Sequence, residues 1–202
     1  MYCHILKGVA VLGAITLTAC GGGSSSGGGS APGGGSGTKA PSYNSLLGQI
    51  EDFNDRYELD DPTAYDNVTT SAEMPVSGKA TYSGAGGYRP ASTPKGAPPP
   101  IVGKATMNAS FGKGTVSGRV TNLKASPGNR TSGGTIKMEG VIRDIAVDAA
   151  VNGNLDLNGK THKFSNRGVG VFYGRDAEGL TVVSAGKNWD GEDYVVTISG
   201  TE

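Results

Sequence analysis

The sequence predicts an all-β protein, an eight-stranded antiparallel β-barrel preceded by a lipoprotein signal, a Gly/Ser tether and a short acidic helix. Two observations favour the barrel. From Met74 onward the apolar residues recur at every second position, which is the period of half-buried strands, and turn residues separate these runs. Closure of such strands into a barrel removes exposed edges that would otherwise aggregate. We therefore expect residues 74–202 to form one barrel domain.

The beginning of the chain resembles a bacterial lipoprotein signal. One fixed charge, Lys7, precedes an uncharged apolar stretch from Val9 to Leu17, which is too short to span a bilayer and is typical of a cleaved signal. The stretch closes in the tetrapeptide LTAC, a bacterial lipobox whose cysteine is Cys20. We expect residues 1–19 to be removed and Cys20 to carry lipid, including palmitate. The alternative is an ordinary secretory signal with a chance cysteine.

Gly21 and the two cysteines indicate where the protein is located and whether it contains a disulfide. Gly21 stands where Asp would favour retention in the inner membrane of enteric bacteria, so we expect a lipid-anchored protein of the outer membrane, displayed at the cell surface. Cys3 leaves with the signal and Cys20 carries lipid, so the mature chain has no disulfide. A packed core must therefore supply its stability.

A tether follows the cysteine. Between Gly21 and Gly37 the chain is almost wholly glycine and serine, a composition that behaves as flexible coil. About 18 such residues have a root-mean-square reach of about 20 to 25 Å. We expect residues 20–42, the acylated cysteine and its tether, to hold the folded part away from the membrane.

An acidic helical segment is expected over residues 43–73. Apolar side chains recur at helical spacing, with Ser42, Asn44 or Ser45 as the cap and Asp60-Asp61-Pro62 as the stop. The segment has eight acidic residues against Arg56 alone, whereas residues 74–202 have fifteen basic residues against ten acidic ones. The acidic face is either simply solvated or docks on the mildly basic barrel by charge. The apolar positions are Leu46, Leu47, Ile50, Phe53 and Tyr57, and the acidic face comprises Glu51, Asp52, Asp55 and Glu58.

Eight or nine short strands are expected after Met74. The inward positions are small, which favours a barrel filled by side chains over one with an internal ligand cavity. A slip in the alternation near Arg143-Asp144 indicates a bulge or sheet corner, and Asn152-Gly153 and Asn158-Gly159 are turn signals. The expected strands cover residues 76–82, 105–111, 116–120, 136–142, 145–151, 161–165, 168–173, 180–185 and 194–200, with a turn at 112–114 and the small inward residues Gly78, Ala80, Ala105, Ala109, Gly118 and Gly140.

Two motifs resemble the transferrin-binding protein B family, which includes factor H-binding protein. Residues 170–178, GVFYGRDAE, are similar to that family's G-x-F-Y-G-x-x-A-x-E signature, and residues 109–118, ASFGKGTVSG, resemble its hairpin. The resemblance covers about Val76 to Glu202 and implies the barrel of the family's C-lobe. One departure is Gly179-Leu180, where the family has two glycines. Another is the single expected barrel, since transferrin-binding protein B has two lobes, each with a handle domain.

The first motif also has a physical interpretation as a barrel-closing strand. Gly170 and Gly174 allow a sharply coiled strand to turn without a Cβ atom. Phe172 and Tyr173 are neighbours in the strand and therefore point to opposite faces. One of the two rings should lie inside the barrel.

Enzymatic chemistry is not expected. After cleavage His162 is the one histidine, and the chain has no G-x-S-x-G elbow and no cluster with metal-ligand spacing. The glycines at 84–87 do not open a helix after a strand, so they are not a phosphate cradle. The acids at 190–193 lie in a turn and are solvated or, as the alternative, form a weak calcium contact. We expect no catalytic residue, no metal, no cofactor and no nucleic-acid partner.

Two loops are candidate contact surfaces. The first, Ser83–Ile101, contains Tyr88 and Arg89, which are residue types enriched at binding hot spots; the second, Lys124–Gly134, contains Arg130. The alternatives are a disordered surface loop and a plain connection.

The function that follows is a monomeric, non-catalytic surface lipoprotein. It would engage a macromolecular or iron-bearing partner through barrel loops, beside a TonB-dependent receptor or a lipoprotein translocon, as the family resemblance implies. One alternative is a binder of haem or another small ligand, with His162 or Tyr88 as the first axial-ligand candidates. Another is a structural or adhesive surface protein.

Overall fold

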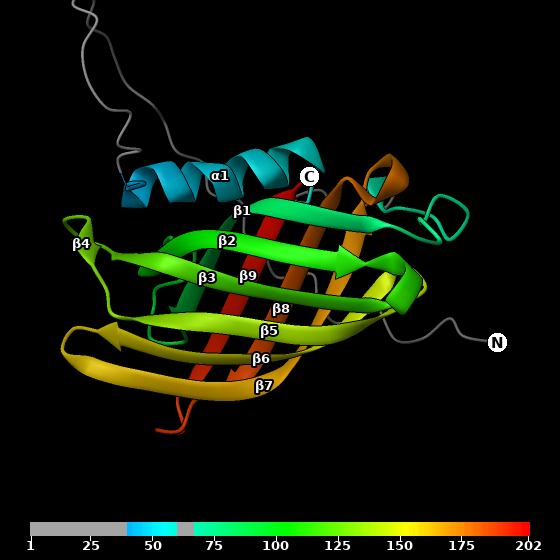
Figure 1. Ribbon diagram of the computed structural model, residues 1–202. Coiled ribbons are helices and arrows are strands. Elements are labelled where there is room, and N and C mark those ends of the chain that lie inside the picture. Colours follow the sequence, from blue (N-terminus) through cyan, green and yellow to red (C-terminus); the bar gives the residue numbers. More distant parts are fainter. Residues whose placement is uncertain (1–39, 60–66) are drawn as a thin grey trace, which may run out of the picture.

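The structure, a computed structural model, describes residues 40–59 and 67–202. Within these ranges one long helix lies on the outside of an antiparallel β-barrel (Figure 1). The helix is α1 (Tyr43–Arg56), and the strands are β1 (Lys79–Pro90), β2 (Ile101–Ser110), β3 (Thr115–Ala125), β4 (Arg130–Thr131), β5 (Gly134–Arg143), β6 (Ala146–Leu157), β7 (Lys160–Tyr173), β8 (Gly179–Lys187) and β9 (Asp193–Thr201), with 3₁₀ turns at Phe111–Lys113 and Arg175–Ala177.

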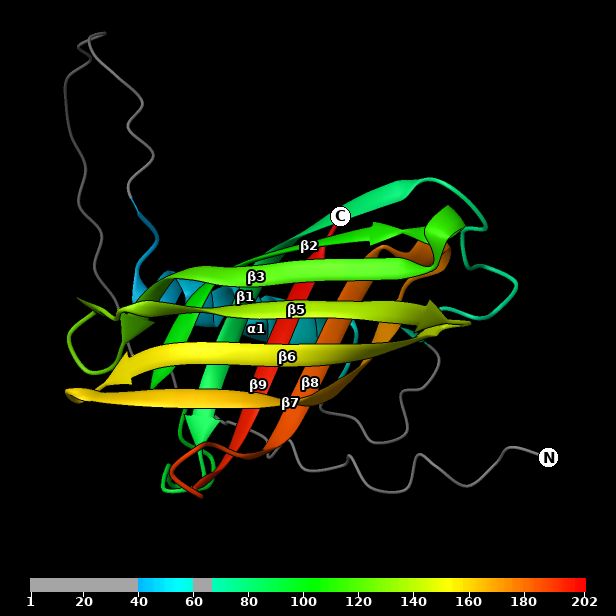
Figure 2. The same cartoon turned by 60° about the horizontal axis from the view of Figure 1, so that its bottom comes forward.

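The barrel is an up-and-down meander that closes between its first and last strands. Eight strands pair antiparallel with their neighbours along the chain, and β1 then pairs with β9 from Ser83↔Thr201 to Pro90↔Tyr194. The short β4 pairs only with β3 and stands outside the closed ring. Figure 2 shows β5, β6 and β7 crossing in front of β8 and β9, which form the opposite wall. The expectation of an eight-stranded antiparallel barrel with one preceding helix is confirmed, while the signal and the tether lie outside the described residues.

Aromatic side chains fill the barrel interior at one end. Tyr88 lies 5.5 Å from Phe164 and 5.6 Å from Tyr194 between ring centroids, and Phe164 lies 4.6 Å from Tyr194. All three side chains are buried. Offset aromatic pairs at these distances add to the free energy of burial. This part of the interior is therefore a packed core, in agreement with the filled barrel expected from the sequence.

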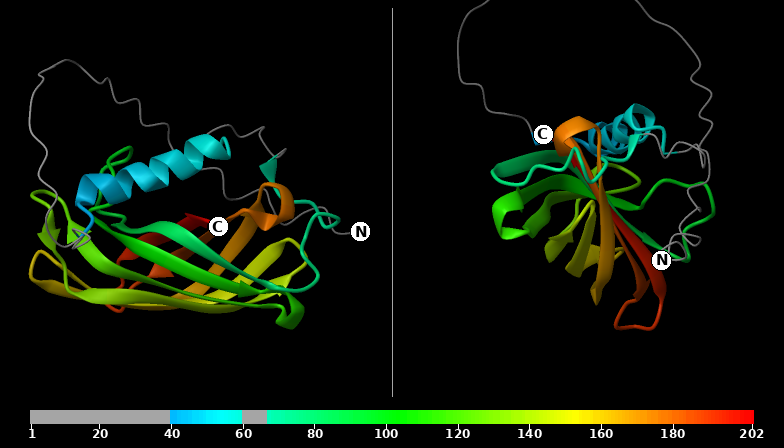
Figure 3. Two further views of the ribbon diagram at one scale, coloured as in Figure 1. Left: turned by 45° about the horizontal axis from the view of Figure 1, so that its top comes forward. Right: turned by 90° about the vertical axis from the view of Figure 1, so that its right-hand side faces the viewer.

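Helix α1 begins where the sequence indicates and ends earlier than expected. Ser42 is the cap, since its hydroxyl accepts a hydrogen bond of 3.1 Å from the backbone N–H of Ser45. The helix ends at Arg56, before the expected stop at residues 60–62, which lie outside the described residues. Figure 3 shows it along the outer face of the barrel.

Two apolar contacts hold α1 on the barrel. In the N-terminal contact, Tyr43 and Leu46 pack with Ala85 of β1 and Val102 of β2. In the C-terminal contact, Phe53 and Tyr57 pack with Tyr173 at the end of β7. Among the described residues no ion pair joins α1 to a strand, so the helix docks through its apolar face and not by the charge attraction considered above. Its acidic face is solvated, with Asp52, Asp55 and Glu58 exposed.

Strand β1 corrects two expectations. Val76 was expected inside the barrel but is 91 % exposed, because β1 begins only at Lys79 after Gly78 has turned the chain with φ +95°. At its other end β1 continues to Pro90, so the first half of the expected loop Ser83–Ile101 is strand. The glycines there serve close strand pairing: a Cβ atom on Gly84 would overlap the carbonyl oxygen of Ser199 in β9.

Three further expectations about bulges, turns and strands are corrected. The slip near Arg143-Asp144 is neither a bulge nor a corner but the tight turn from β5 to β6, in which Asp144 has φ +57°. Asn152-Gly153 is not a turn, since it lies inside β6 opposite Ser165 and Phe164. Gly153 is required because a Cβ atom there would overlap the ring of Phe164. The strands expected at 161–165 and 168–173 are one strand, β7, and Asn158-Gly159 is the turn before it.

Candidate functional site

The longer connections gather at one end of the barrel, here called the loop end. Antiparallel strands place the connections after β1, β3, β6 and β8 at the same end, and these cover residues 91–100, 126–133, 158–159 and 188–192. Two of these connections, 91–100 and 126–133, are longer than any connection at the opposite end. Loops on a rigid scaffold are where binding residues concentrate. The loop end is therefore the first place to look for a contact surface.

Trp189 is the most exposed large aromatic side chain at the loop end. It is the one tryptophan of the chain, and 75 % of its surface is exposed. Its backbone N–H donates to the carbonyl oxygen of Lys163 at 2.9 Å, and the Lys163 ammonium lies 5.7 Å from the indole centroid. An exposed tryptophan beside a lysine is an amphipathic contact group, of the kind enriched at interface centres.

Asn188 fixes the turn that carries Trp189. Its side chain is buried, and its Oδ1 accepts hydrogen bonds of 3.0 Å from the backbone N–H groups of Asp190 and Glu192. The backbone N–H of Asn188 donates to the carbonyl oxygen of Glu192 at 2.9 Å. An asparagine that bonds the backbone ahead of it in this way builds a preformed turn. The backbone that carries Trp189 is therefore held in a set position, without the ordering that a mobile loop would require on binding.

A buried polar cluster lies directly beneath this turn. The Tyr88 hydroxyl and the Asn188 Nδ2 each lie 3.4 Å from His162 Nδ1, and 3.5 Å separates Asn188 Nδ2 from the Tyr88 hydroxyl. Glu192 Oε2 lies 3.8 Å from the same imidazole nitrogen. Burial raises the pKa of the Tyr88 hydroxyl, while its hydrogen bond with Asn188 acts in the opposite direction. The cluster joins the aromatic interior to the exposed turn.

The first expected contact residues are distributed differently from the prediction. Tyr88 is not in a loop: it lies in β1 with 0 % exposure and points into the barrel, so an external partner does not reach it. Arg89 is half-buried in the same strand and donates from its guanidinium to the carbonyl oxygen of Pro94 at 2.6 Å, which braces the loop after β1. Arg130 is exposed in β4 at the loop end.

The haem candidates Tyr88 and His162 come together in space. Their ring centroids lie 5.8 Å apart and both side chains are buried. Phe164 and Tyr194 stack on Tyr88 from within the barrel, so the pair faces packed aromatic rings. Within the described residues no group of three or more His, Cys, Asp or Glu side chains is placed to hold a metal ion.

The acidic turn before β9 is paired with lysines of the same end. Asp190 lies 3.1 Å from the Lys160 ammonium, and Asp193 lies 3.0 Å from that of Lys187. Both pairs are exposed, so each contributes little to stability. Their effect is to leave the surface around Trp189 mixed in charge.

The GVFYG motif lies at the opposite end, where β7 closes. Phe172 points inward, with its ring centroid 6.1 Å from that of Tyr82 and 5.8 Å from that of Phe111. Tyr173 points outward and is covered by α1. A Cβ atom on Gly170 would lie 2.6 Å from the carbonyl oxygen of Thr181, and Gly174 has φ +76°. The strands that close the ring are β1 and β9, so this β7 motif secures the core and the helix.

The sequence predicts a turn at residues 190–193, and it also contains a signal for the exposure of Trp189 beside them. Trp189 is the one tryptophan, and it stands in the run Asn-Trp-Asp-Gly between two predicted strands. Asn and Gly in such a run favour a tight turn, which exposes the residue between them. The contact of Asn188 with His162 could not be read in this way, because 26 residues separate the two.

Comparisons with known proteins bear on the fold. No model of a known protein family matches the chain, and no curated protein matches it. Of the described residues, no helix is long and apolar enough to cross a membrane.

Solved structures of transferrin-binding protein B are similar to the barrel. A single-site mutant of the vaccine antigen from Haemophilus parasuis Hp5 has a TM-score of 0.49 at 16 % identity, with 66 % of this chain and 28 % of that chain covered. A double mutant of the same protein has a TM-score of 0.44 at 14 % identity, covering 66 % and 27 %. Intact Ap-TbpB, with N and C lobes, has a TM-score of 0.48 at 15 % identity, covering 66 % and 28 %.

The chain therefore spans under a third of the length of these proteins. At such identities and scores the likeness concerns the barrel fold and says nothing of ligands. These solved structures are of transferrin-binding protein B, the protein whose family the two motifs resemble.

Proposed function

We propose that this protein is a non-catalytic, lipid-anchored surface module that binds a macromolecular or iron-bearing partner at the loop end. The observation that carries the proposal is Trp189, which is 75 % exposed on a turn fixed by buried Asn188. A large apolar side chain held in water has no role in the core of this barrel. Rigidly presented tryptophans are typical centres of binding energy, because little conformational freedom is lost on contact.

The surroundings of Trp189 support a polar rim around that centre. Lys163 lies against the indole, and Asp190, next to Trp189 in the chain, pairs with Lys160. The hydroxyl of Ser92 donates to Glu192 at 2.7 Å and ties the loop after β1 to the tryptophan turn. An apolar centre surrounded by polar and charged groups is the usual anatomy of a transient protein interface.

A non-catalytic role is consistent with the position of His162. This imidazole, the one in the described part of the chain, contacts Tyr88, Asn188 and Glu192, and none of these is a serine or cysteine nucleophile. Haem binding is the second candidate, since Tyr88 and His162 are brought together. Haem binding would require the stacked aromatic rings of the interior to separate. A Soret band that appears on titration with haem, and that His162→Ala weakens, would favour haem binding over the loop-end proposal.

Replacing Trp189 with alanine should weaken partner capture by about 30-fold or more, because truncating a central hot-spot residue costs about 2 kcal/mol or more. The measurement is a pulldown from the natural growth environment with the full chain, followed by titration of the captured partner. Val195→Ala is a matched control, since Val195 is an exposed apolar residue of β9 with 40 % exposure, outside the turn. Undiminished capture by the Trp189 variant would contradict the proposal.

The anchor has its own test. We propose that residues 1–19 are cleaved, that Cys20 is acylated, and that residues 20–42 tether the module to the outer membrane at the cell surface. In a Cys20→Ala variant, labelling by a palmitate analogue should be lost, and the protein should leave the membrane fraction. Retained labelling and unchanged fractionation would contradict the lipid anchor, whatever the outcome at Trp189.

A further inference from the structure

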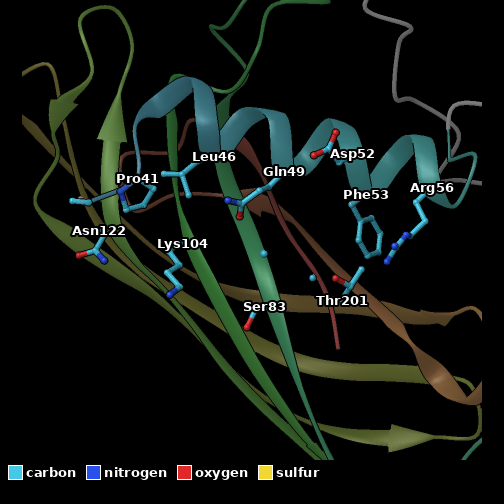
Figure 4. A pocket seen from close by; sticks show the side chains of 13 residues that line it. Pro41, Leu46, Gln49, Asp52, Phe53, Arg56, Ser83, Lys104, Asn122 and Thr201 are labelled. Atoms are coloured by element: carbon cyan, nitrogen blue, oxygen red, sulfur yellow. The ribbon is translucent and has the colours of Figure 1, made fainter. Parts of the chain in front are cut away.

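The middle of α1 spans a hollow on the outer wall of the barrel. The N-terminal and C-terminal contacts hold the two halves of the helix, and between helix and strands lies a volume of about 910 Å³ (Figure 4). Helices that pack on a sheet normally leave few voids. A volume of several hundred Å³ lies in the size range of small-molecule sites.

The two walls of the hollow carry different groups. On the helix side, Gln49, Phe53 and Arg56 line it; on the barrel side, Lys104 of β2 and Asn122 of β3 do. Figure 4 shows Phe53 reaching down from the helix, with Lys104 and Arg56 toward opposite ends of the hollow. Phe53 is 4 % exposed, so only a small part of its ring borders the hollow, between polar groups at the two ends.

The hollow is positively charged. Among residues 40–59 and 67–202, none forms an ion pair with Lys104 or Arg56. Asp52 also lines the hollow, but Figure 4 shows its carboxylate turned away from the strands. Two cations on facing walls, without a compensating acid between them, attract an anion. Arg in particular binds carboxylate and sulfonate-like groups through paired N–H donors.

A β-bulge provides one of the polar groups. The register between β2 and β3 shifts between Val102↔Lys124 and Lys104↔Thr121, and Asn122 within this bulge has φ +53°. The extra residue lets buried Leu123 point inward while exposed Asn122 points out to the hollow. Bulges commonly re-aim a side chain next to a functional site. Its amide is placed in the strand next to Lys104.

We propose that this hollow binds a small organic anion with an apolar body. The carboxylate or sulfonate of the ligand contacts Lys104, Asn122 of the neighbouring strand donates a further hydrogen bond, and the apolar body extends past the exposed part of Phe53 toward Arg56. The site is separate from the turn that carries Trp189. Its ligand can therefore be present or absent without altering partner capture at the loop end.

Titration with anilinonaphthalene sulfonate, a fluorescent aromatic anion, tests the proposal in the full chain carrying Cys20→Ala. One saturable site is expected. Lys104→Gln should weaken binding about tenfold, because it removes the charge-assisted contact, and Arg56→Gln, at the far end of the hollow, should weaken binding less. Trp189→Ala should leave the affinity unchanged, which separates this site from the proposed partner surface.

Two control variants and a stability measurement complete the test. Lys137→Gln removes one exposed positive charge from β5, outside the hollow, and should leave the affinity unchanged. Asp52→Asn should leave the affinity for the fluorescent anion unchanged or increase it. Melting curves must show that all variants are folded, which excludes dye binding to an unfolded chain. The proposal is overturned if Lys104→Gln binds as the parent does, if Lys137→Gln weakens binding as much as Lys104→Gln does, or if no saturable site is found.

Discussion

Replacing Phe172 with alanine should lower the free energy of unfolding by about 3–5 kcal/mol, the usual cost of removing a fully buried phenylalanine ring. Phe172 is 0 % exposed and lies between Tyr82 and Phe111 inside the barrel. The shortened side chain leaves a cavity between strands that close on one another, so the walls cannot collapse to fill it. Denaturant titration of parent and variant gives the difference.

The control for this change lies in the same strand. Val169 of β7 is 50 % exposed, so Val169→Ala should alter the unfolding free energy by about 0.5 kcal/mol or less. Tyr173, the outward neighbour of Phe172, does not serve as a control, because it is buried against Phe53 and Tyr57 of the helical segment. Equal losses in the Phe172 and Val169 variants would show that Phe172 is not a core residue.

Gly134→Ala should destabilise the barrel by about 2–5 kcal/mol. Gly134 begins β5 with φ +100°, where an L side chain is strained by about 1–2 kcal/mol. A Cβ atom there would also overlap the carbonyl oxygen of Asn154 in β6, and an overlap of this kind adds about 1–3 kcal/mol. The neighbour is backbone, which cannot move without opening the β5–β6 pairing.

Gly159→Ala separates the two causes. Gly159 has φ +76° in the turn before β7, but a Cβ atom there meets nothing within 4 Å. This variant should lose about 1–2 kcal/mol of unfolding free energy, which is the cost of the backbone strain alone. If both glycine variants lost the same stability, the overlap with Asn154 would have no effect.

The alternation of apolar residues was sufficient to predict most strands, because a half-buried strand shows its period within its own residues. It was not sufficient to separate the two Asn-Gly pairs. Asn158-Gly159 is a turn, whereas Gly153 is in the middle of β6 because the ring of Phe164 lies over it. Whether an Asn-Gly pair forms a turn or lies within a strand depends on which residue the next strand places opposite, and the local sequence does not contain that information.

The same limit applies to the first strand and its site residue. The glycines at 84–87 have the composition of a loop, so Tyr88 was expected on the surface. Their role follows from pairing with β9, more than a hundred residues later, where small residues allow the ring to close. The sequence indicated His162 and Tyr88 separately. They are 74 residues apart in the chain, and only the closed barrel brings their side chains into contact.

The start of α1 has a mechanical consequence. The backbone N–H of Tyr43 donates to Asn129 at 2.6 Å, and its hydroxyl donates to the carbonyl oxygen of Pro99 at 2.6 Å, so the chain arrives at the barrel beside the loop end. With the anchor proposed above, membrane and partner pull on the same end of the molecule. A force between them passes from the first turn of α1 through the loop end to the tryptophan turn, and the far end of the barrel bears the least of it. Detachment under flow would then begin by peeling the helix from its N-terminus, and the barrel would stay folded while it lasted.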